Sequence, residues 1–187
     1  MINRPIILGS GSPRRQYLMN EAGFDFSVEK TEFNESFPDS LPIKQVARYL
    51  ALKKAEYFRL KIQKEIVVTA DTVVILDGAI LNKPLDRPDA IRMLSSLSGK
   101  THLVLTGVCI FSAEKEESFD DSTEVTFKKL SIAEIEYYVD NFKPYDKAGA
   151  YGAQDFMGMI AIERINGSFY NVMGFPIHKV YQHLITW

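Results

Sequence analysis

The sequence predicts an α/β fold in which helices flank a mixed, twisted sheet. Helical and strand patterns alternate along most of the 187 residues, as they do in sheets that are covered by helices. Two hairpin-type turns, Asp77-Gly78 and Asn166-Gly167, imply antiparallel pairs, so the sheet cannot be purely parallel. Hydrophobic residues form 46% of the chain and charged residues 25%, which suffices for the core of one compact unit.

The first part of the chain begins with a strand, a small-residue loop and a helix. The apolar run 6–8 predicts the strand, and the Gly and Ser residues of 9–12 predict the loop. Ser12 is a good N-cap and Pro13 a good first helical residue, so we expect a helix over 13–22. The elements expected next are a short strand near 26–28, an irregular loop over 33–41, and a helix over 42–60 whose apolar face contains Ile43, Val46, Ala47, Leu50, Ala51 and Phe58.

The rest of the chain continues the alternation. The β-branched run 66–76 and the turn at Asp77-Gly78 predict a hairpin that returns through 79–81. The remaining expected elements are a helix over 88–97 that Gly99 ends, strands over 102–111 and 123–130 around an exposed acidic loop at 114–121, a helix from the capping box Ser131–Glu134 to Phe142, a Gly-rich loop over 146–154, the hairpin at Asn166-Gly167, and a helix from Pro176.

Composition narrows the class of partner and the location. The formal net charge of -2 gives no general attraction to nucleic acid or to an anionic membrane, so a small anion is the expected partner. No run is long and apolar enough to span a bilayer and no signal peptide is visible, which predicts a cytoplasmic protein. Cys109 is the only cysteine, and the three histidines share no metal-ligand spacing.

The loop before the first helix has the features of an anion site. Gly residues let the backbone approach an anion, and the N–H groups of a helix N-terminus point toward it. Arg14 and Arg15 lie in the first turn, where each exposed positive charge is unfavourable by roughly 0.3–1 kcal/mol. Guanidinium groups bind phosphate oxygens in pairs, so both arginines favour a phosphate ligand. The alternative is a capped helix whose arginines are merely solvated.

Two charged residues interrupt apolar patterns. Lys54 falls within the apolar stripe of the helix over 42–60, either as a functional ammonium or as a lysine that reaches water along the stripe. Asp71 lies in the apolar run "IVVTADTVVIL", where a carboxylate needs a metal, a cation or hydrogen bonds. Its alternative is a structural aspartate that pairs with a buried lysine. Thr72 would point to the opposite face unless the strand is bulged or ends there.

Two later segments carry weaker signals. Lys83 follows the predicted hairpin that also contains Asp71, and Pro84 makes its surroundings extended and rigid. Taken alone, Lys83 would be a surface lysine. The loop "DKAGAYGAQ" ends on Gln154, whose amide is suited to recognise hydrogen-bonding groups of a ligand. The alternative is a plain connecting loop.

Taken together, the segments "SGSPRRQYL", "LALKKA", "TADTVVILDGAILNKP", "LSGKTHLVLTGV", "DKAGAYGAQ" and "INGSFYNVMGFPI" resemble the Maf family of nucleoside triphosphate pyrophosphatases. The similarity runs in order over nearly the whole chain, and the form of the "DKAGAYGAQ" loop resembles the branch that acts on dTTP and UTP. The resemblance implies a single domain over 1–187 with an inosine triphosphatase-like fold, an elongated two-lobed body with a central cleft. It also implies a homodimer.

The resemblance also implies roles for individual residues. Asp71 matches the catalytic aspartate and Glu35 the acid of the cleft, and both would hold Mg²⁺ or Mn²⁺. Asp155 and Met157 stand where related sequences usually have glycine, which could alter base selectivity. The other matched positions are Arg15, Lys54 and Lys83 as phosphate-cleft cations, Arg14, Thr72 and Gln154 as specificity residues, and Ser10 and Ser12 as loop serines.

The expected activity is metal-dependent hydrolysis of dTTP and UTP to the nucleoside monophosphate and pyrophosphate, which would remove non-standard nucleotides from the pool. One alternative is a nucleotide-binding regulator of septum formation with little turnover. A third interpretation keeps the chemistry but assigns it to modified or purine nucleotides, with Gln154 and its neighbours as the positions that decide.

Overall fold

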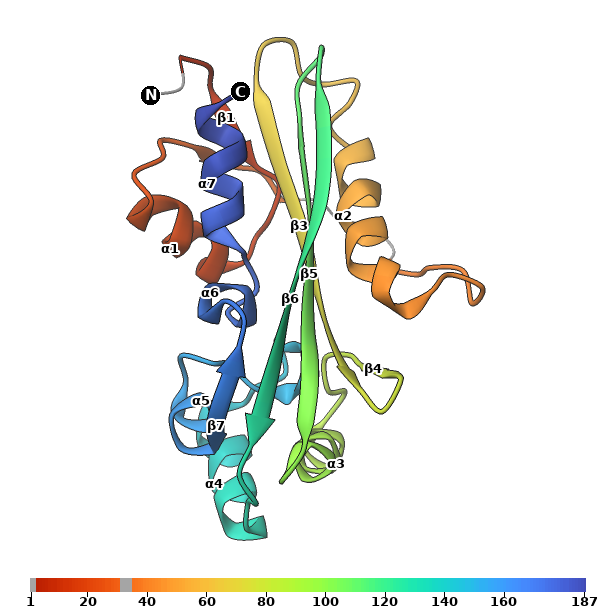
Figure 1. The fold of residues 1–187 in the computed structure, drawn as a ribbon, viewed down its shortest axis with the longest axis vertical. Helices are drawn as coiled ribbons and strands as arrows, with labels where there is room; N and C mark the ends of the chain where they lie inside the picture. Colours follow the sequence, from red (N-terminus) through yellow and green to blue (C-terminus); the bar gives the residue numbers. More distant parts are fainter. Residues whose placement is uncertain (1–2, 31–34) are drawn as a thin grey trace. The chain divides into compact units, whose positions relative to one another are not determined.

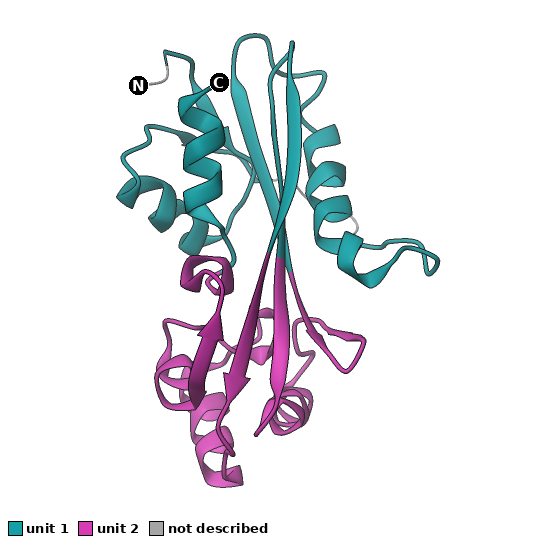
Figure 2. Cartoon of the chain, in the orientation of Figure 1, with its two compact units in different colours: residues 1–72, 106–121, 174–187 teal, residues 73–105, 122–173 magenta. Residues whose placement is uncertain are grey.

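The structure is a computed structural model that describes residues 3–30 and 35–187. The chain divides into two compact units, which Figure 2 distinguishes by colour. Unit 1 contains residues 1–72, 106–121 and 174–187, and unit 2 contains residues 73–105 and 122–173. The single domain expected over 1–187 stays a prediction.

A mixed, seven-stranded sheet confirms the predicted fold class. The strand order is β2-β1-β3-β5-β6-β7, with β4 paired to β3. β1 pairs in parallel with both β2 and β3, whereas β3–β4 and β6–β7 are antiparallel. The strands are β1 Ile6–Leu8, β2 Ser27–Val28, β3 Ile66–Leu76, β4 Ala79–Leu81, β5 Thr101–Phe111, β6 Glu116–Phe127 and β7 Ile162–Asn166.

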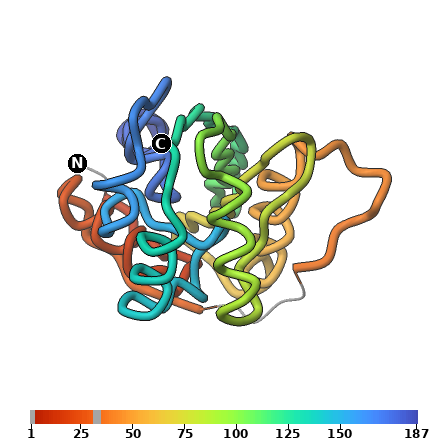
Figure 3. The backbone as a smooth tube through the Cα atoms, turned by 90° about the horizontal axis from the view of Figure 1, so that it is seen from below, coloured from red at the N-terminus to blue at the C-terminus, as the bar shows by residue number. Residues whose placement is uncertain are grey.

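In unit 1, helices cover both faces of the strands. Figure 1 shows α2 on one face and α1 and α7 on the other. The loop between residue 35 and α2 extends away from the strands, in line with the irregular loop predicted over 33–41, of which 33 and 34 lie outside the described residues (Figure 3). The helices of this unit are α1 Pro13–Glu21, the short 3-10 helix η1 Ile43–Gln45, α2 Val46–Glu56 and α7 Ile177–Ile185.

The predicted helix over 42–60 is shorter in the structure. It begins as a 3-10 turn, and regular α-helix ends at Glu56. Beyond that point the chain turns, because the amide of Phe58 bonds to the carbonyl of Ala55, only three residues back. Phe58 is nevertheless buried, in a cluster that also contains Cys109.

Unit 2 follows the sequence patterns closely at its helices. The capping box at Ser131 and Glu134 is present and opens α4. The four positions expected on the inner face of α3 are all buried, namely Ala90, Met93, Leu94 and Leu97. The helices of this unit are α3 Arg87–Leu97, α4 Ile132–Phe142, the 3-10 helix η2 Ala148–Ala150, α5 Phe156–Ala161 and α6 Phe169–Val172.

The prediction of an exposed acidic loop over 114–121 is wrong, because most of this segment belongs to β6, which begins at Glu116. The amide of Ser112 bonds to the carbonyl of Lys115 at 2.8 Å, so the connection from β5 is a tight turn. Basic groups from other elements of unit 1 then neutralise the acidic strand: Arg59 lies 2.5 Å from Glu116, and Lys179 lies 2.6 Å from Asp121. Because these partners are distant in sequence, the local pattern gave no sign of them.

The prediction of a hairpin at Asn166-Gly167 is also wrong, because the short helix α6 follows the turn in place of a strand. Ser168 caps α6 by accepting a hydrogen bond from the amide of Asn171 at 3.3 Å. Gly167 has a φ of 133° and packs so closely on Thr123 that a Cβ would lie 2.7 Å from its hydroxyl. The dipeptide therefore turns the chain, but into α6. None of the helices in the described residues is long and apolar enough to cross a membrane.

Candidate active site

The predicted site residues divide between the two units. Lys83 and Gln154 belong to unit 2. The other eight belong to unit 1: Ser10, Ser12, Arg14, Arg15, Glu35, Lys54, Asp71 and Thr72. We describe each group within its own unit.

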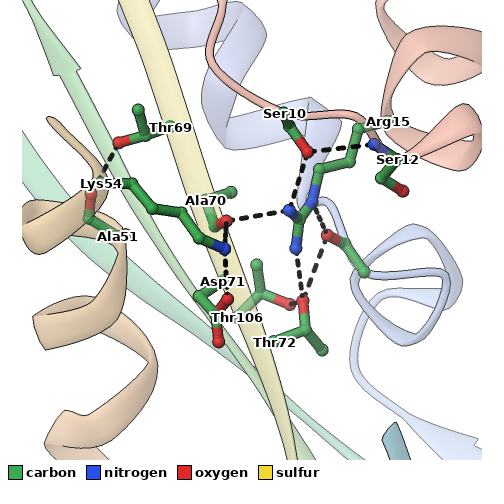
Figure 4. A network of polar contacts seen from close by, with 11 residues as sticks. Ser10, Ser12, Arg15, Ala51, Lys54, Thr69, Ala70, Asp71, Thr72 and Thr106 are labelled. Carbon is green, nitrogen blue, oxygen red and sulfur yellow. Dashed lines mark hydrogen bonds and ion pairs between the residues drawn. The ribbon is translucent and has the colours of Figure 1, made fainter. Parts of the chain in front are cut away.

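A largely buried ion pair joins Lys54 of α2 to Asp71 of β3. The Nζ atom of Lys54 lies 2.5 Å from Oδ1 of Asp71 and 3.2 Å from the carbonyl oxygen of Ala70, as Figure 4 shows. The two side chains are only 11% and 14% exposed. The apolar stripe of α2 therefore places Lys54 toward the protein interior, where its ammonium group contacts Asp71 of β3.

Burial and charge act on Lys54 in opposite directions. Burial lowers the pKa of Lys54, while the carboxylate of Asp71 and, more weakly, that of Glu35 raise it. This pairing with a buried lysine is what the structural interpretation of Asp71 predicted. However, Oδ2 of Asp71 accepts no hydrogen bond from the described residues, so one carboxylate oxygen is available for further chemistry.

Arg15 points into the protein and is almost fully hydrogen-bonded there. Nε donates to the carbonyl of Gly174 at 2.9 Å, and Nη1 donates to that of Ala70 at 2.8 Å. Nη1 also donates to the Ser10 hydroxyl at 3.1 Å, and Nη2 donates to that of Thr72 at 3.2 Å. Burial lowers the pKa of Arg15 to about 10. These contacts favour a role in holding the site together, beside the phosphate-binding role implied by the family resemblance.

The small-residue loop leads from β1 into α1 as predicted. Ser12 occupies the N-cap position, but its side chain makes no capping hydrogen bond, and its amide donates to the Ser10 hydroxyl at 3.3 Å. Gly9 is required by close packing, because a Cβ there would lie 2.7 Å from the ring of Phe58. The loop is therefore pressed against the core, with the N-terminus of α1 directly after it.

Arg14 and Glu35 contribute charge at this site. Arg14 is half-buried in the first turn of α1, and its positive charge adds to burial in lowering the pKa of Arg15. Glu35 is exposed, and its negative charge opposes burial by raising the pKa of both Arg15 and Lys54. The carboxylates of Glu35 and Asp71 therefore act on the same two cations.

Thr72 is held by contacts that the sequence did not reveal. β3 runs through Asp71 and Thr72 as part of one strand, which ends only at Leu76. The Thr72 hydroxyl lies 2.9 Å from that of Thr106 on β5 and donates to the carbonyl of Gly174 at 3.2 Å. Thr106 was detectable in principle as a polar residue within an apolar strand. The Gly174 carbonyl has no signature in the sequence.

In unit 2, a backbone hydrogen bond links the two segments that carry Lys83 and Gln154. The amide of Gly149 donates to the carbonyl of Asn82 at 3.1 Å, beside Lys83. Both Lys83 and Gln154 are exposed, as a role in binding a ligand requires.

The Asp155 side chain is in contact with the loop over 146–154 that precedes it. Oδ2 of Asp155 lies 3.5 Å from Nζ of Lys147, so an ion pair connects the two ends of the loop. The hydroxyl of Tyr138 lies at the same distance from this oxygen. Lys147 of the loop therefore neutralises the negative charge of Asp155.

The oxygen donors of unit 1 fit a hard divalent cation that the substrate helps to hold. Asp71 and Glu35 supply carboxylates, and no cluster of three or more metal-ligating side chains occurs in residues 3–30 and 35–187. Mg²⁺ commonly binds one or two carboxylates and takes its other ligands from water and substrate phosphates. The donor set matches that pattern.

Comparison with known proteins gives a consistent result. The family described as Maf-like protein matches residues 5–187. A dTTP/UTP pyrophosphatase of Porphyromonas gingivalis is 50% identical, over 96% of this chain and 92% of its own length. One of Flavobacterium psychrophilum is 47% identical, over 98% and 95%. The HAM1 protein of Coxiella burnetii shares the fold, with a TM-score of 0.54, 12% identity and coverage of 98% of this chain and 100% of its own.

Proposed function

The chain belongs to the Maf family, and from that premise we propose that it hydrolyses the pyrimidine nucleoside triphosphates dTTP and UTP to the monophosphate and pyrophosphate. Relatives that are 45–50% identical over most of the chain are named for this activity. The single observation that carries the proposal is the buried Lys54–Asp71 pair, since one oxygen of its carboxylate is without a hydrogen bond in the described chain.

The proposed reaction needs one nucleophile and one leaving group. The oxygen of a water molecule attacks the α-phosphorus, the bond from that phosphorus to the bridging oxygen breaks, and pyrophosphate leaves. Asp71 accepts a proton of the attacking water, and Lys54 keeps the carboxylate in place. Arg14, Lys83 and the N–H groups at the start of α1 would neutralise the charge that develops on the phosphates.

A divalent cation, Mg²⁺ or Mn²⁺, would be held by Asp71 and Glu35 together with the substrate. When bound, it supplies charge neutralisation at the phosphate oxygens. Gln154 and Arg14 are proposed to recognise the base, and Thr72 is proposed to affect which base is chosen. The cytoplasmic location and the homodimer stay predictions.

The regulator without turnover is not favoured. Binding alone needs cations more than carboxylates, yet this chain keeps Asp71 in contact with Lys54, and Glu35 acts electrostatically on both Lys54 and Arg15. The relatives, moreover, are named as pyrophosphatases.

The test is pyrophosphate release from dTTP, UTP, CTP, GTP, ATP and 7-methyl-GTP with Mg²⁺ or Mn²⁺, in the natural protein and in Asp71→Asn. We expect fast release from dTTP and UTP, and a loss of at least about 100-fold in Asp71→Asn, because the amide cannot accept the proton. Circular dichroism should show that this variant keeps its fold.

Each other outcome has a definite meaning. Full activity in Asp71→Asn would refute the role of the carboxylate. Turnover of another nucleotide would keep the chemistry and shift attention to Asp155 and Met157. Tight binding without turnover of any nucleotide would favour the regulator.

A further inference from the structure

The hydroxyl of Thr72 has no hydrogen-bonding capacity left for a ligand. A threonine hydroxyl has one proton to donate and two lone pairs that accept. The carbonyl of Gly174 can only accept, so it takes the Thr72 proton at 3.2 Å. The guanidinium of Arg15 can only donate, and it occupies one lone pair at 3.2 Å. For the 2.9 Å contact with Thr106 to be a hydrogen bond as well, Thr106 must donate into the second lone pair.

Thr106 therefore determines whether the Thr72 hydroxyl has a lone pair available for a ligand. Its side chain is completely buried on β5, directly beside β3 in the sheet. Without the Thr106 hydroxyl, Thr72 would regain one lone pair. A substrate that approached could then bond to Thr72 directly.

The same network reaches the peptide that precedes Asp71. The carbonyl of Ala70 accepts from Nη1 of Arg15 and from Nζ of Lys54, so two cations hold this one oxygen (Figure 4). Arg15 thus links the hydroxyl of Thr72 to the peptide group between Ala70 and Asp71.

We propose that Thr106 is a positioning residue for the reaction. Together with Arg15 it keeps Thr72 saturated, so that Thr72 affects the choice of nucleotide through the network and makes no hydrogen bond to the substrate. This inference rests on the proposed function and assigns a role to a residue outside the predicted site.

The test is a double-mutant cycle with Thr72→Val, Thr106→Val and the double variant, because valine keeps the shape of threonine and removes the hydroxyl. The measured quantity is the ratio of kcat/KM for dTTP to that for CTP. If the two hydroxyls act as one unit, each single variant changes this ratio by at least about fivefold, as expected for one lost hydrogen bond, and the double variant changes it no further.

Two further variants separate positioning from general damage. Thr106→Ser keeps the hydroxyl and should restore the natural ratio. Thr101→Val removes a matched hydroxyl pair between β5 and β6, in which Thr101 lies 2.8 Å from Thr126, and should leave the ratio unchanged. A ratio that changes in Thr72→Val and stays unchanged in Thr106→Val would overturn the proposal, since Thr72 would then contact the substrate directly.

Unfolding of the same variants provides a readout that does not need turnover. Thr72→Val should lower the Tm more than Thr106→Val, because it also removes the contacts with Arg15 and Gly174, and the double variant should lose less than the sum of the two single losses. Additive losses would overturn the network, whatever the enzyme hydrolyses. Absence of turnover in the natural protein would instead refute the proposed function, and coupled unfolding would still confirm the hydroxyl network.

Discussion

At the scale of single residues, the site depends on a charge pair that the fold largely, but not completely, removes from water. Neither Lys54 nor Asp71 would be placed in an apolar pattern for stability alone, because replacing a buried ion pair by apolar side chains is often neutral or stabilising. Breaking such a pair is different, since the partner that remains is a buried charge without compensation. Removing one charge and removing both therefore affect stability differently, whereas either change removes a group that the proposed reaction needs.

We predict that Lys54→Met lowers the free energy of unfolding by about 2–4 kcal/mol, because Asp71 loses its cation. The double variant Lys54→Met/Asp71→Asn should recover most of this loss, since neither group is then charged, and should remain inactive. Urea unfolding and pyrophosphate release measure the two quantities.

The matched control for this prediction is Lys53→Met on the same helix. Lys53 is only half-buried and donates to the carbonyl of Ser36 at 2.9 Å, so its loss should change the unfolding free energy by less than about 0.5 kcal/mol. A double variant as unstable as Lys54→Met alone would contradict the assignment of the loss to an uncompensated charge.

At the scale of elements, the contact between α2 and β5 fixes where Lys54 can reach. Gly107 of β5 lies against the backbone of α2, where a Cβ would come within 2.2 Å of the amide nitrogen of Arg48. Rotation of a side chain cannot relieve such a contact, because the atoms that the added Cβ would meet belong to the backbone of α2. The absence of a side chain at Gly107 therefore sets the distance between the helix that carries Lys54 and the sheet that carries Asp71.

We predict that Gly107→Ala destabilises the protein by at least about 3 kcal/mol and lowers turnover, because α2 must move away from the sheet. Gly78→Ala is the comparison. Gly78 has a φ of 78°, and apart from its chain neighbours no described residue has a heavy atom within 4 Å of the added Cβ. The substitution should therefore cost only about 1–2 kcal/mol of backbone strain and leave turnover unchanged. Thermal unfolding and the pyrophosphate assay would show the difference, and equal effects of the two variants would contradict it.

At the scale of the whole molecule, a buried histidine links stability to pH. Nε2 of His102 lies 2.7 Å from the hydroxyl of Tyr151, while Nδ1 has no hydrogen-bond partner in the described residues. Its ring also packs edge-on against Phe127. Burial lowers the pKa of His102 to about 4, so the folded protein keeps this ring neutral at pH values where the unfolded chain protonates it.

We predict that this group makes the protein less stable as the pH falls from about 6.5 toward 4. In that range the unfolded chain binds more protons than the folded one, so the free energy of unfolding rises with pH. The contribution is complete above pH 6.5 and amounts to about 3 kcal/mol. Urea unfolding at a series of pH values measures it.

His102→Gln serves as the control, because glutamine does not titrate and can still bond to Tyr151. The free energy of unfolding of this variant should depend less steeply on pH between pH 4 and 6.5. The same slope in both proteins would show that His102 titrates normally in the folded state.

The sequence by itself determined most of the elements and the positions of the charged residues within them. The β3–β4 hairpin, the capping box of α4 and the inner face of α3 follow from patterns of two, three or four neighbouring residues, and they agree with the structure. Local periodicity likewise placed Lys54 on an apolar face and Asp71 in an apolar strand. These features depend on residues close in sequence, which is why the sequence shows them.

Only the tertiary structure decided which of these groups meet. Lys54 and Asp71 are 17 positions apart, and Arg15 bonds to a carbonyl 159 positions away, which no local pattern encodes. The acidic segment became β6 because distant lysine and arginine side chains neutralise it, and Thr106 gained its role because β5 lies beside β3. Buried polar groups must find partners wherever the packing of elements brings donors and acceptors together, and that packing is a property of the whole fold.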